Sequence, residues 1–142
     1  MKVSDLMKSN VITAPPEMSA AEAARMMQRE DVGILPICDR SGQLRGVLTD
    51  RDIVTRCVAA RNDPTRIQIG DLMTKKVCSI SPGEDLHAAA QLMAGEQIRR
   101  LPVLEQDRLV GMLSLADLAH SDFYGMEAAQ ALTEITDRLT EY

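Results

Sequence analysis

The stretch GVLTDRD at residues 46–52 carries the most specific pattern in this chain, and it returns as GMLSLAD at residues 111–117. The two copies share a glycine, two apolar residues, a small hydroxyl residue and, three positions after it, an aspartate. Each copy lies where a short apolar run (45–49 and 109–114) gives way to a helical run. The pattern therefore predicts a strand that ends at a helix N-terminus, with a hydroxyl at the cap and a carboxylate in the first turn.

Two interpretations of this junction are open from the motif alone. In a capping box, the hydroxyl accepts a backbone N–H and the carboxylate reaches back to the cap residue. The same groups also suit a nucleotide, because free N–H groups and the helix dipole favour a phosphate. An ionised carboxylate, which only accepts hydrogen bonds, suits the two hydroxyls of a ribose.

The rest of the chain repeats in the same way. Up to residue 36 the copies are offset by 66 residues, one residue is lost in a polar turn (39–42 against 105–107), and an offset of 65 follows. A deletion at a loop tip is where a repeat tolerates one. The chain is therefore an internal duplication, with identical pairs at Asp5/Asp71, Leu6/Leu72, Met7/Met73, Val11/Val77, Pro16/Pro82, Ala23/Ala89, Ala24/Ala90, Met27/Met93, Glu30/Glu96, Leu35/Leu101, Pro36/Pro102, Leu44/Leu109, Gly46/Gly111, Leu48/Leu113 and Asp52/Asp117.

Each repeat is expected to have the order β-α-β-β-α. Strands are predicted at 11–14 and 77–80, and again at 33–38 and 99–104 before the junction strand. The first helix is predicted to open at Pro16 or Pro82, with residues 81–84 (SPGE) as a capping box. A repeat of roughly 50 residues buries too little surface to be reliably stable alone. We therefore predict an α/β (α+β) fold in which the two repeats, 1–62 and 63–122, pack as one pseudo-twofold module.

A helical tail is predicted for residues 123–142. Its apolar residues fall on one helical face. Such a face can pack on its own module or contact a second subunit or partner, and both remain open. The face comprises Ala128, Ala129, Leu132, Ile135 and Leu139.

Composition excludes several classes of function. The chain has 142 residues and a formal charge of -5, which argues against general nucleic-acid binding because that needs a basic surface. Three cysteines without CxxC spacing predict reduced thiols in the cytoplasm, and two isolated histidines predict no metal site. No apolar run approaches the roughly 18 residues of a membrane span, so no membrane association is expected.

Taken together, the duplicated β-α-β-β-α unit, its Asp-Leu-Met opening, its Leu-Pro strand and its Gly-x-x-Ser/Thr-x-x-Asp junction resemble a tandem cystathionine-β-synthase (CBS) domain pair. The resemblance covers residues 1 to about 120. It implies a regulatory module, with no cofactor required, that binds an adenosine-containing ligand such as AMP, ADP, ATP, NADH or S-adenosylmethionine. It also implies pairing of modules into homodimers.

In that family, each of two clefts between the repeats takes an aspartate from one repeat and strand residues from the other. Carried over, the first site would use Val47, Thr49 and Asp52 with Val77, Cys78, Ile98, Arg99 and Arg100. The second site would use Met112, Ser114 and Asp117 with Val11, Ile12, Val32 and Gly33.

The two sites are expected to differ in charge. Arg99 and Arg100 match positions where phosphate-binding members carry basic residues, and Arg51 is a further candidate, whereas Gly33 and Ile34 replace the basic pair in repeat 1. The resemblance therefore implies that the Asp52 site prefers phosphate-bearing ligands. The alternative is that Arg99 and Arg100 are ordinary surface residues with no ligand, because an exposed arginine before a strand is unremarkable.

Three functions compete on the sequence alone. The first is a ligand sensor, and the second is an interaction or dimerisation scaffold that keeps the fold without a ligand. Hydroxyl and carboxylate in both repeats favour the sensor, although capping alone could retain them. An enzyme is not expected, because the sequence contains no nucleophile–base pair, P-loop or metal cluster.

Overall fold

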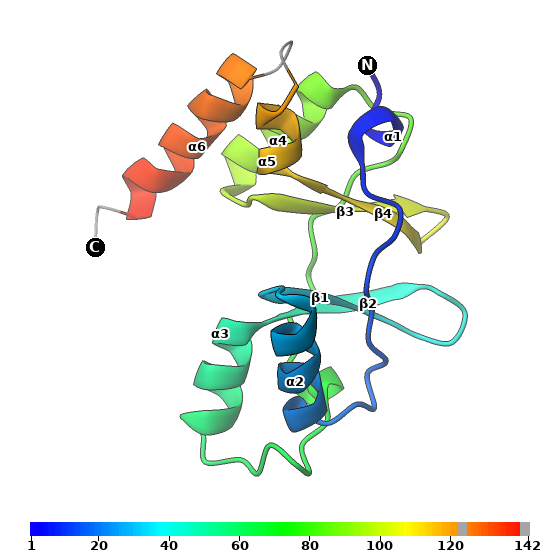
Figure 1. Cartoon of the computed structure of the whole chain (residues 1–142), viewed down its shortest axis with the longest axis vertical. Coiled ribbons are helices and arrows are strands. Elements are labelled where there is room, and N and C mark those ends of the chain that lie inside the picture. The colour runs from blue at the N-terminus through cyan, green and yellow to red at the C-terminus, as the bar shows by residue number, and fades with distance from the viewer. Residues whose placement is uncertain (122–124, 140–142) are drawn as a thin grey trace. The chain divides into compact units, whose positions relative to one another are not determined.

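The computed structural model describes residues 1–121 and 125–139, with side chains placed for 1–121 and 129–136. Helices and strands alternate in both halves of the sequence, which confirms the mixed α and β class (Figure 1). The elements are α1 (Val3–Leu6), α2 (Ala20–Glu30), β1 (Ile34–Cys38), β2 (Leu44–Thr49), α3 (Asp50–Asp52), the π-helical η1 (Ile53–Val58), the 3-10 turn η2 (Ile69–Asp71), α4 (Leu86–Glu96), β3 (Arg100–Glu105), β4 (Arg108–Ser114), α5 (Leu115–Ala119) and α6 (Gly125–Leu139).

Each repeat contains one antiparallel hairpin, β1–β2 in the first and β3–β4 in the second. The strand register of both hairpins shifts near the turn, and the turn is the segment whose length differs between the repeats. The strands predicted at 11–14 and 77–80 are reduced to single parallel bridges, Ala14↔Ile37 and Ile80↔Val103. The prediction was too long for a physical reason. The opposing residues Pro36 and Pro102 have no N–H, so each can only accept a hydrogen bond and the ladder does not extend.

The first helix of each repeat begins later than its predicted start at Pro16 or Pro82. Ser19 caps α2 by accepting the N–H of Glu22, and Asp85 caps α4 by accepting the N–H of His87. Residues 81–84 form a turn instead of the predicted capping box. The cause lies in the proline carbonyls, which accept N–H groups of the opening segments: Gly70 bonds Pro16 at 2.9 Å and Ser4 bonds Pro82 at 3.0 Å.

The chain forms two compact units, and each takes its opening segment from the other repeat. The repeat-1 unit comprises 12–77, and the repeat-2 unit comprises 1–11 with 78–142. Accordingly, α1 is bonded to the approach to α4 (Val3 N–H to Glu84 carbonyl, 2.8 Å), and η2 is bonded to the approach to α2. The sequence repeats, predicted as 1–62 and 63–122, therefore do not coincide with the compact units.

Each unit has its own aliphatic core under one face of its hairpin. Alternation along the strands points every second side chain toward the helices. The strands contribute Leu35, Ile37 and Leu48 to the core of the repeat-1 unit, and Leu101, Val103 and Leu113 to the core of the repeat-2 unit.

The tail helix α6 packs on α4 and α5 of the repeat-2 unit. Its buried residues are Ala131 and Ile135, at 2% and 5% exposed, while Leu132 is 42% exposed and Ala129 is also exposed. The buried face of α6 is therefore rotated relative to the predicted one, because packing against both α4 and α5 buries Ala131 and leaves Leu132 partly exposed. The predicted side chains of Ala128 and Leu139 lie outside the described residues. Among the helices in the described part of the chain, none has the length and apolar character of a membrane span.

Candidate functional site

Both strand-to-helix junctions form capping boxes. In repeat 1 the Asp52 N–H donates to Thr49 Oγ1 at 3.0 Å, and the Thr49 N–H donates to Asp52 Oδ2 at 3.0 Å. In repeat 2 the same two bonds join Ser114 and Asp117 at 3.0 and 2.9 Å. The capping interpretation is therefore confirmed in both copies, and it accounts for the hydroxyl and for one carboxylate oxygen.

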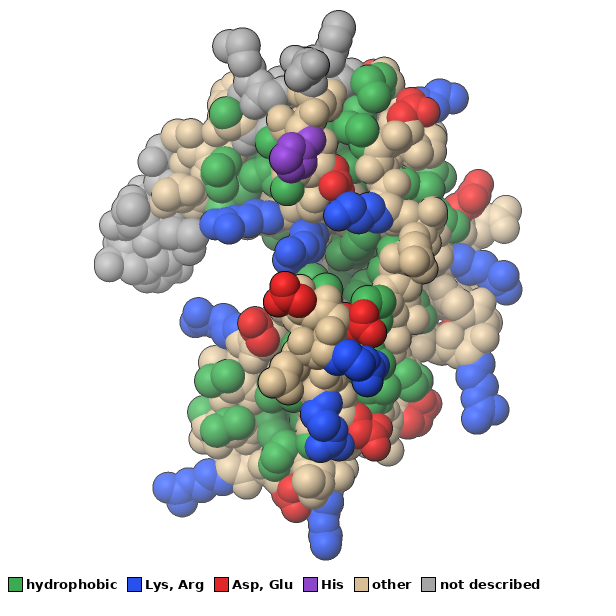
Figure 2. Space-filling model, viewed as in Figure 1, with side chains coloured by type: hydrophobic (Ala, Val, Ile, Leu, Met, Phe, Trp, Pro, Cys, Tyr) green, Lys and Arg blue, Asp and Glu red, His purple; other side chains and the backbone are tan. Residues whose placement is uncertain are grey.

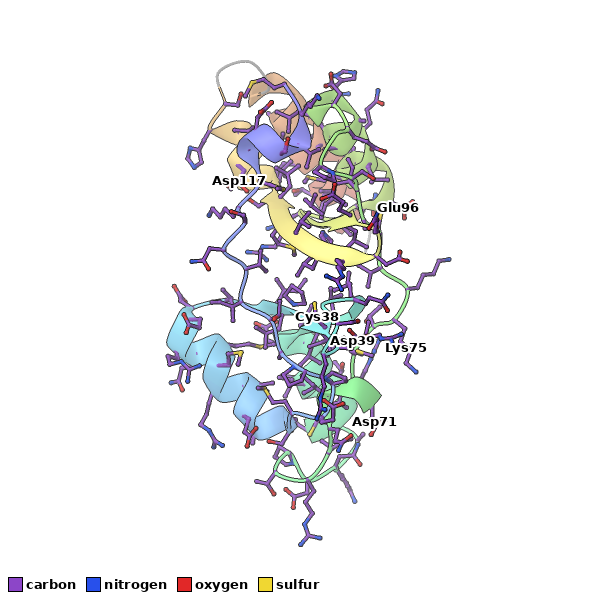
Figure 3. All side chains as sticks on the ribbon, turned by 90° about the vertical axis from the view of Figure 1, so that its right-hand side faces the viewer. Cys38, Asp39, Asp71, Lys75, Glu96 and Asp117 are labelled. Carbon is purple, nitrogen blue, oxygen red and sulfur yellow. The ribbon has the colours of Figure 1, made fainter. Side chains whose placement is uncertain are left out.

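The second oxygen of each carboxylate is held more loosely. Asp52 Oδ1 lies 3.7 Å from Nε of Arg56, and Asp117 Oδ1 lies 3.9 Å from Nζ of Lys8, on the N-terminal segment beside it (Figure 3). Both separations are too long for a hydrogen bond, and the aspartate side chains keep 13% and 14% of their surface exposed. Because an ionised carboxylate offers about four acceptor positions, the box leaves capacity for a ribose hydroxyl.

The motif glycines let the opening segments lie against the junction strands. A Cβ on Gly46 would lie 2.6 Å from the backbone oxygen of Thr74, and a Cβ on Gly111 would lie 2.6 Å from the sulfur of Met7. Paired backbone bonds hold these contacts, Val47 with Thr74 in one unit and Met112 with Lys8 in the other. The glycine in the pattern therefore has a packing role that supports the junction.

The residue that precedes the first hairpin strand anchors the closing helix in each unit. The Gly33 carbonyl accepts the N–H of Asp50 at 3.0 Å, and the Arg99 carbonyl accepts the N–H of Leu115 at 2.7 Å. A Cβ on Gly33 would lie 3.4 Å from a carboxylate oxygen of Asp50. The surroundings of this position therefore differ in charge, because uncharged Gly33 lies beside the Asp50 carboxylate in repeat 1 and the equivalent residue in repeat 2 is Arg99. This difference supports the predicted asymmetry toward anions.

A groove of about 480 Å³ in the repeat-2 unit brings several predicted residues together. Arg99 and Arg100 are exposed there, and neither side chain makes a hydrogen bond or ion pair with any described residue. Arg100 is also the strand partner of Ser114. The lining residues are Arg99, Arg100, Ser114, Leu115, Ala116, Ala119, Ala129 and Leu132.

This groove joins residues that the sequence analysis assigned to different sites. The family resemblance implies the arginines for the Asp52 site and Ser114 for the Asp117 site. The structure brings the arginines and Ser114 together within one unit, and use of the arginines together with Asp52 stays a prediction. Sequence reasoning did not find the tail helix as a wall of the groove, although the apolar spacing of Leu132 was a signal for it.

The remaining predicted residues occupy equivalent places in the two repeats. Val32 and Ile98 follow the left-handed helix caps Asp31 and Gln97, and their N–H groups bond the carbonyls of Met27 and Met93 at 3.0 Å. The pairs 11–12 and 77–78 lie where the chain passes from one compact unit to the other. Val47 and Met112 are half-buried, on the hairpin face opposite the helices.

The cysteines are free thiols. Burial raises the pKa of Cys78, and the charge of Glu96 adds to that increase. Burial likewise raises the pKa of Cys38, with a smaller contribution from Asp39, its neighbour in Figure 3. Both groups therefore hold their protons more tightly than an ordinary cysteine, which disfavours a nucleophilic role.

Comparison with known families matches the CBS domain twice, at residues 3–59 and 69–123. The chain belongs to the CBS-domain family. A relative of similar length is the CBS domain-containing protein YhcV of Bacillus subtilis, 40% identical over 134 residues, with 94% of each chain covered. Tandem CBS pairs are regulatory modules, and the resemblance found in the sequence is confirmed.

Solved CBS structures share the fold. Hypoxic Response Protein I, with two coordinated zinc ions, is 34% identical with a TM-score of 0.78, covering 85% of this chain and 99% of its own. PAE2072 of Pyrobaculum aerophilum, complexed with AMP, is 26% identical with a TM-score of 0.77, covering 92% and 99%. The CBS pair of MJ0100, with 5'-methylthioadenosine and S-adenosyl-L-methionine, is 27% identical with a TM-score of 0.75, covering 89% and 98%.

The zinc ions of Hypoxic Response Protein I raise the question of a metal site in this CBS pair. In the part of the chain that the structure describes, no three His, Cys, Asp or Glu side chains are grouped so that they could hold a metal ion. The groups that remain available are one carboxylate oxygen at each junction and, in the repeat-2 unit, the guanidinium N–H donors of Arg99 and Arg100. This set matches the hydroxyls and phosphates of a nucleotide.

Proposed function

We propose that this CBS pair is a non-enzymatic sensor of an adenosine-containing ligand, with AMP, ADP and ATP as the first candidates and NADH and S-adenosylmethionine as further ones. The observation that carries the proposal is the duplicated junction, where each aspartate keeps one loosely held oxygen beside the capping box. Two CBS neighbours bound to adenosine-containing molecules support it.

We place the ligands as the family arrangement implies, one at each junction with strand residues of the other repeat. The aspartate would accept hydrogen bonds from the ribose, and the arginines would hold phosphate. A change in ligand would then change how the repeats are held, which a partner or the dimer would read. The free thiols support a reducing compartment, the cytoplasm, as the place of action.

The alternative function is a scaffold that binds no ligand. The capping bonds favour it, because helix capping alone explains the hydroxyl and the carboxylate in both motifs. We expect calorimetry and thermal shift with AMP, ADP, ATP, NADH and S-adenosylmethionine to separate the two functions. A ligand at 100 times its dissociation constant adds about 2.7 kcal/mol to the free energy of unfolding, so binding would raise the melting temperature clearly. Absence of heat and of any shift with all five ligands at millimolar concentration would overturn the sensor and leave the scaffold standing.

We also propose that the module forms a homodimer through the closing helix of repeat 1. Val54 and Val58 on η1 are 59% and 61% exposed, and hydrophobic side chains reach the surface over this helix in Figure 2. The duplication points to this face: Val54 corresponds to Ala119 at the offset of 65, and α6 stands beside Ala119 across the groove of the repeat-2 unit. In the repeat-1 unit no described helix takes the place of α6. A second copy would cover the same face by twofold symmetry.

Replacing Val54 and Val58 together by glutamate should weaken the dimer at least about tenfold, because each burial of a valine contributes about 1.5–3 kcal/mol and charge opposes it. Sedimentation equilibrium measures the effect. Thr55→Glu, an exposed position on the same helix, adds one charge without removing an apolar side chain and should leave the dimer intact. A monomeric wild-type protein, or equal weakening by the control, would refute this interface.

A further inference from the structure

We infer that the tail helix α6 forms a wall of the anion-binding groove, so that the state of the bound nucleotide is reported by α6. The inference rests on the proposed nucleotide binding and extends it to regulation. Its geometric basis is the groove of the repeat-2 unit, where Arg99 and Arg100 stand across from Ala129 and Leu132. Figure 2 shows basic side chains of this unit beside the tail.

The chemistry of the groove fits the phosphate end of a nucleotide. Both guanidiniums lack a partner among the described residues and both line the groove, and an unpaired guanidinium attracts an anion and can bind phosphate oxygens bidentately. The volume of about 480 Å³ lies in the range of small-molecule sites. The other walls are mostly apolar, from Leu115, Ala116 and Ala119, so the arginines supply the charged groups of the groove.

The attachment of α6 makes it suited to report occupancy. In its described part, the side chains of Ala131 and Ile135 are buried, and Leu132, next to Ala131, borders the groove at 42% exposed. Ala131 and Ile135 are the only buried side chains among those described for residues 129–136, and the exposed ones contribute little to holding the helix. A ligand that contacts the docked helix favours the docked state by its difference in affinity for the two states. AMP and ATP place different numbers of phosphates in the groove and should therefore hold α6 to different extents.

Charge substitutions at Leu132 test the inference. Leu132→Glu places a carboxylate beside the arginines and should weaken ATP at least tenfold in calorimetry while leaving adenosine nearly unchanged. Leu132→Lys should leave ATP unchanged or bind it more tightly, and this opposite sign separates charge from damage to the fold. Gln130→Glu is the matched control, because Gln130 lines a different groove, between α4 and α6, and it should change neither affinity.

Hydrogen exchange gives a second readout in the unmodified protein. ATP should slow exchange of the amides in residues 129–136 more than AMP does, and adenosine should slow it least. Suppose that wild-type protein binds ATP. If Leu132→Glu then binds ATP as tightly as Gln130→Glu does, or if ATP does not change hydrogen exchange in α6, the inference is overturned and the proposed function stands. If wild-type protein binds none of the three, the inference is overturned, and the proposed function falls with it when NADH and S-adenosylmethionine also fail to bind.

Discussion

Asp52→Asn is expected to weaken the tightest nucleotide-binding event by about tenfold to a hundredfold. A hydrogen bond to a charged group contributes about 1.5–3 kcal/mol, and each 1.4 kcal/mol is tenfold in affinity. Asparagine keeps one side-chain oxygen to accept the Thr49 N–H, so the capping box and the melting temperature without ligand should be almost unchanged. Calorimetry with AMP and ATP measures the loss.

Asp117→Asn is the matched variant, because its box has the same two bonds. If the arginines serve the Asp52 site, Asp117→Asn should spare the tight event. If Asp117→Asn removes it and Asp52→Asn does not, the arginines act with the aspartate of their own repeat, as their shared groove with Ser114 allows. Arg99→Ala with Arg100→Ala should weaken ATP far more than adenosine. If the affinities for ATP and for adenosine fall equally, the arginines support the fold and do not hold phosphate.

The junctions could be predicted from the sequence because their cause is local. A strand, a cap hydroxyl and a carboxylate three residues later leave the backbone few other ways to satisfy its N–H groups. Strands β1–β4 were predicted within about one residue for the same reason, since alternation and a polar turn determine a hairpin. The hydroxyl and carboxylate acceptors of the candidate site could therefore be predicted from the residues next to them in the sequence.

The features that the sequence did not reveal depend on long-range packing. Nothing local to Val3 or Ile69 indicates that each opening segment bonds the approach to a helix of the other repeat. Those bonds also displaced the helix starts from Pro16 to Ala20 and from Pro82 to Leu86. The groove was missed likewise, because Arg99 and Leu132 are brought together only when α6 packs on α4 and α5.

Gly46→Ala is expected to lower the free energy of unfolding by about 1–3 kcal/mol, the usual cost of overpacking. The added Cβ would lie 2.6 Å from the Thr74 carbonyl oxygen. That oxygen cannot retreat freely, since it accepts the Val47 N–H at 3.0 Å and the Thr74 N–H in turn bonds the Val47 carbonyl at 2.9 Å. Thermal unfolding measures the loss, at about 2–4 °C for each kcal/mol in a chain of this size.

Gly111→Ala should cost less than Gly46→Ala, although the motif is the same. Its new Cβ meets the sulfur of Met7 at 2.6 Å, which is the flexible end of a side chain, and the backbone oxygen of Lys8 only at 3.1 Å. Gly95→Ala is the control: nothing lies within 4 Å of its Cβ and it is exposed on α4, so alanine should stabilise by about 0.5–1 kcal/mol. If Gly46→Ala melts with the wild type, or below it by no more than Gly111→Ala, then the Thr74 backbone does not constrain the junction. The glycine of the motif would then have to be explained by the ligand, because a nucleotide that approaches the strand backbone also needs a position without a side chain.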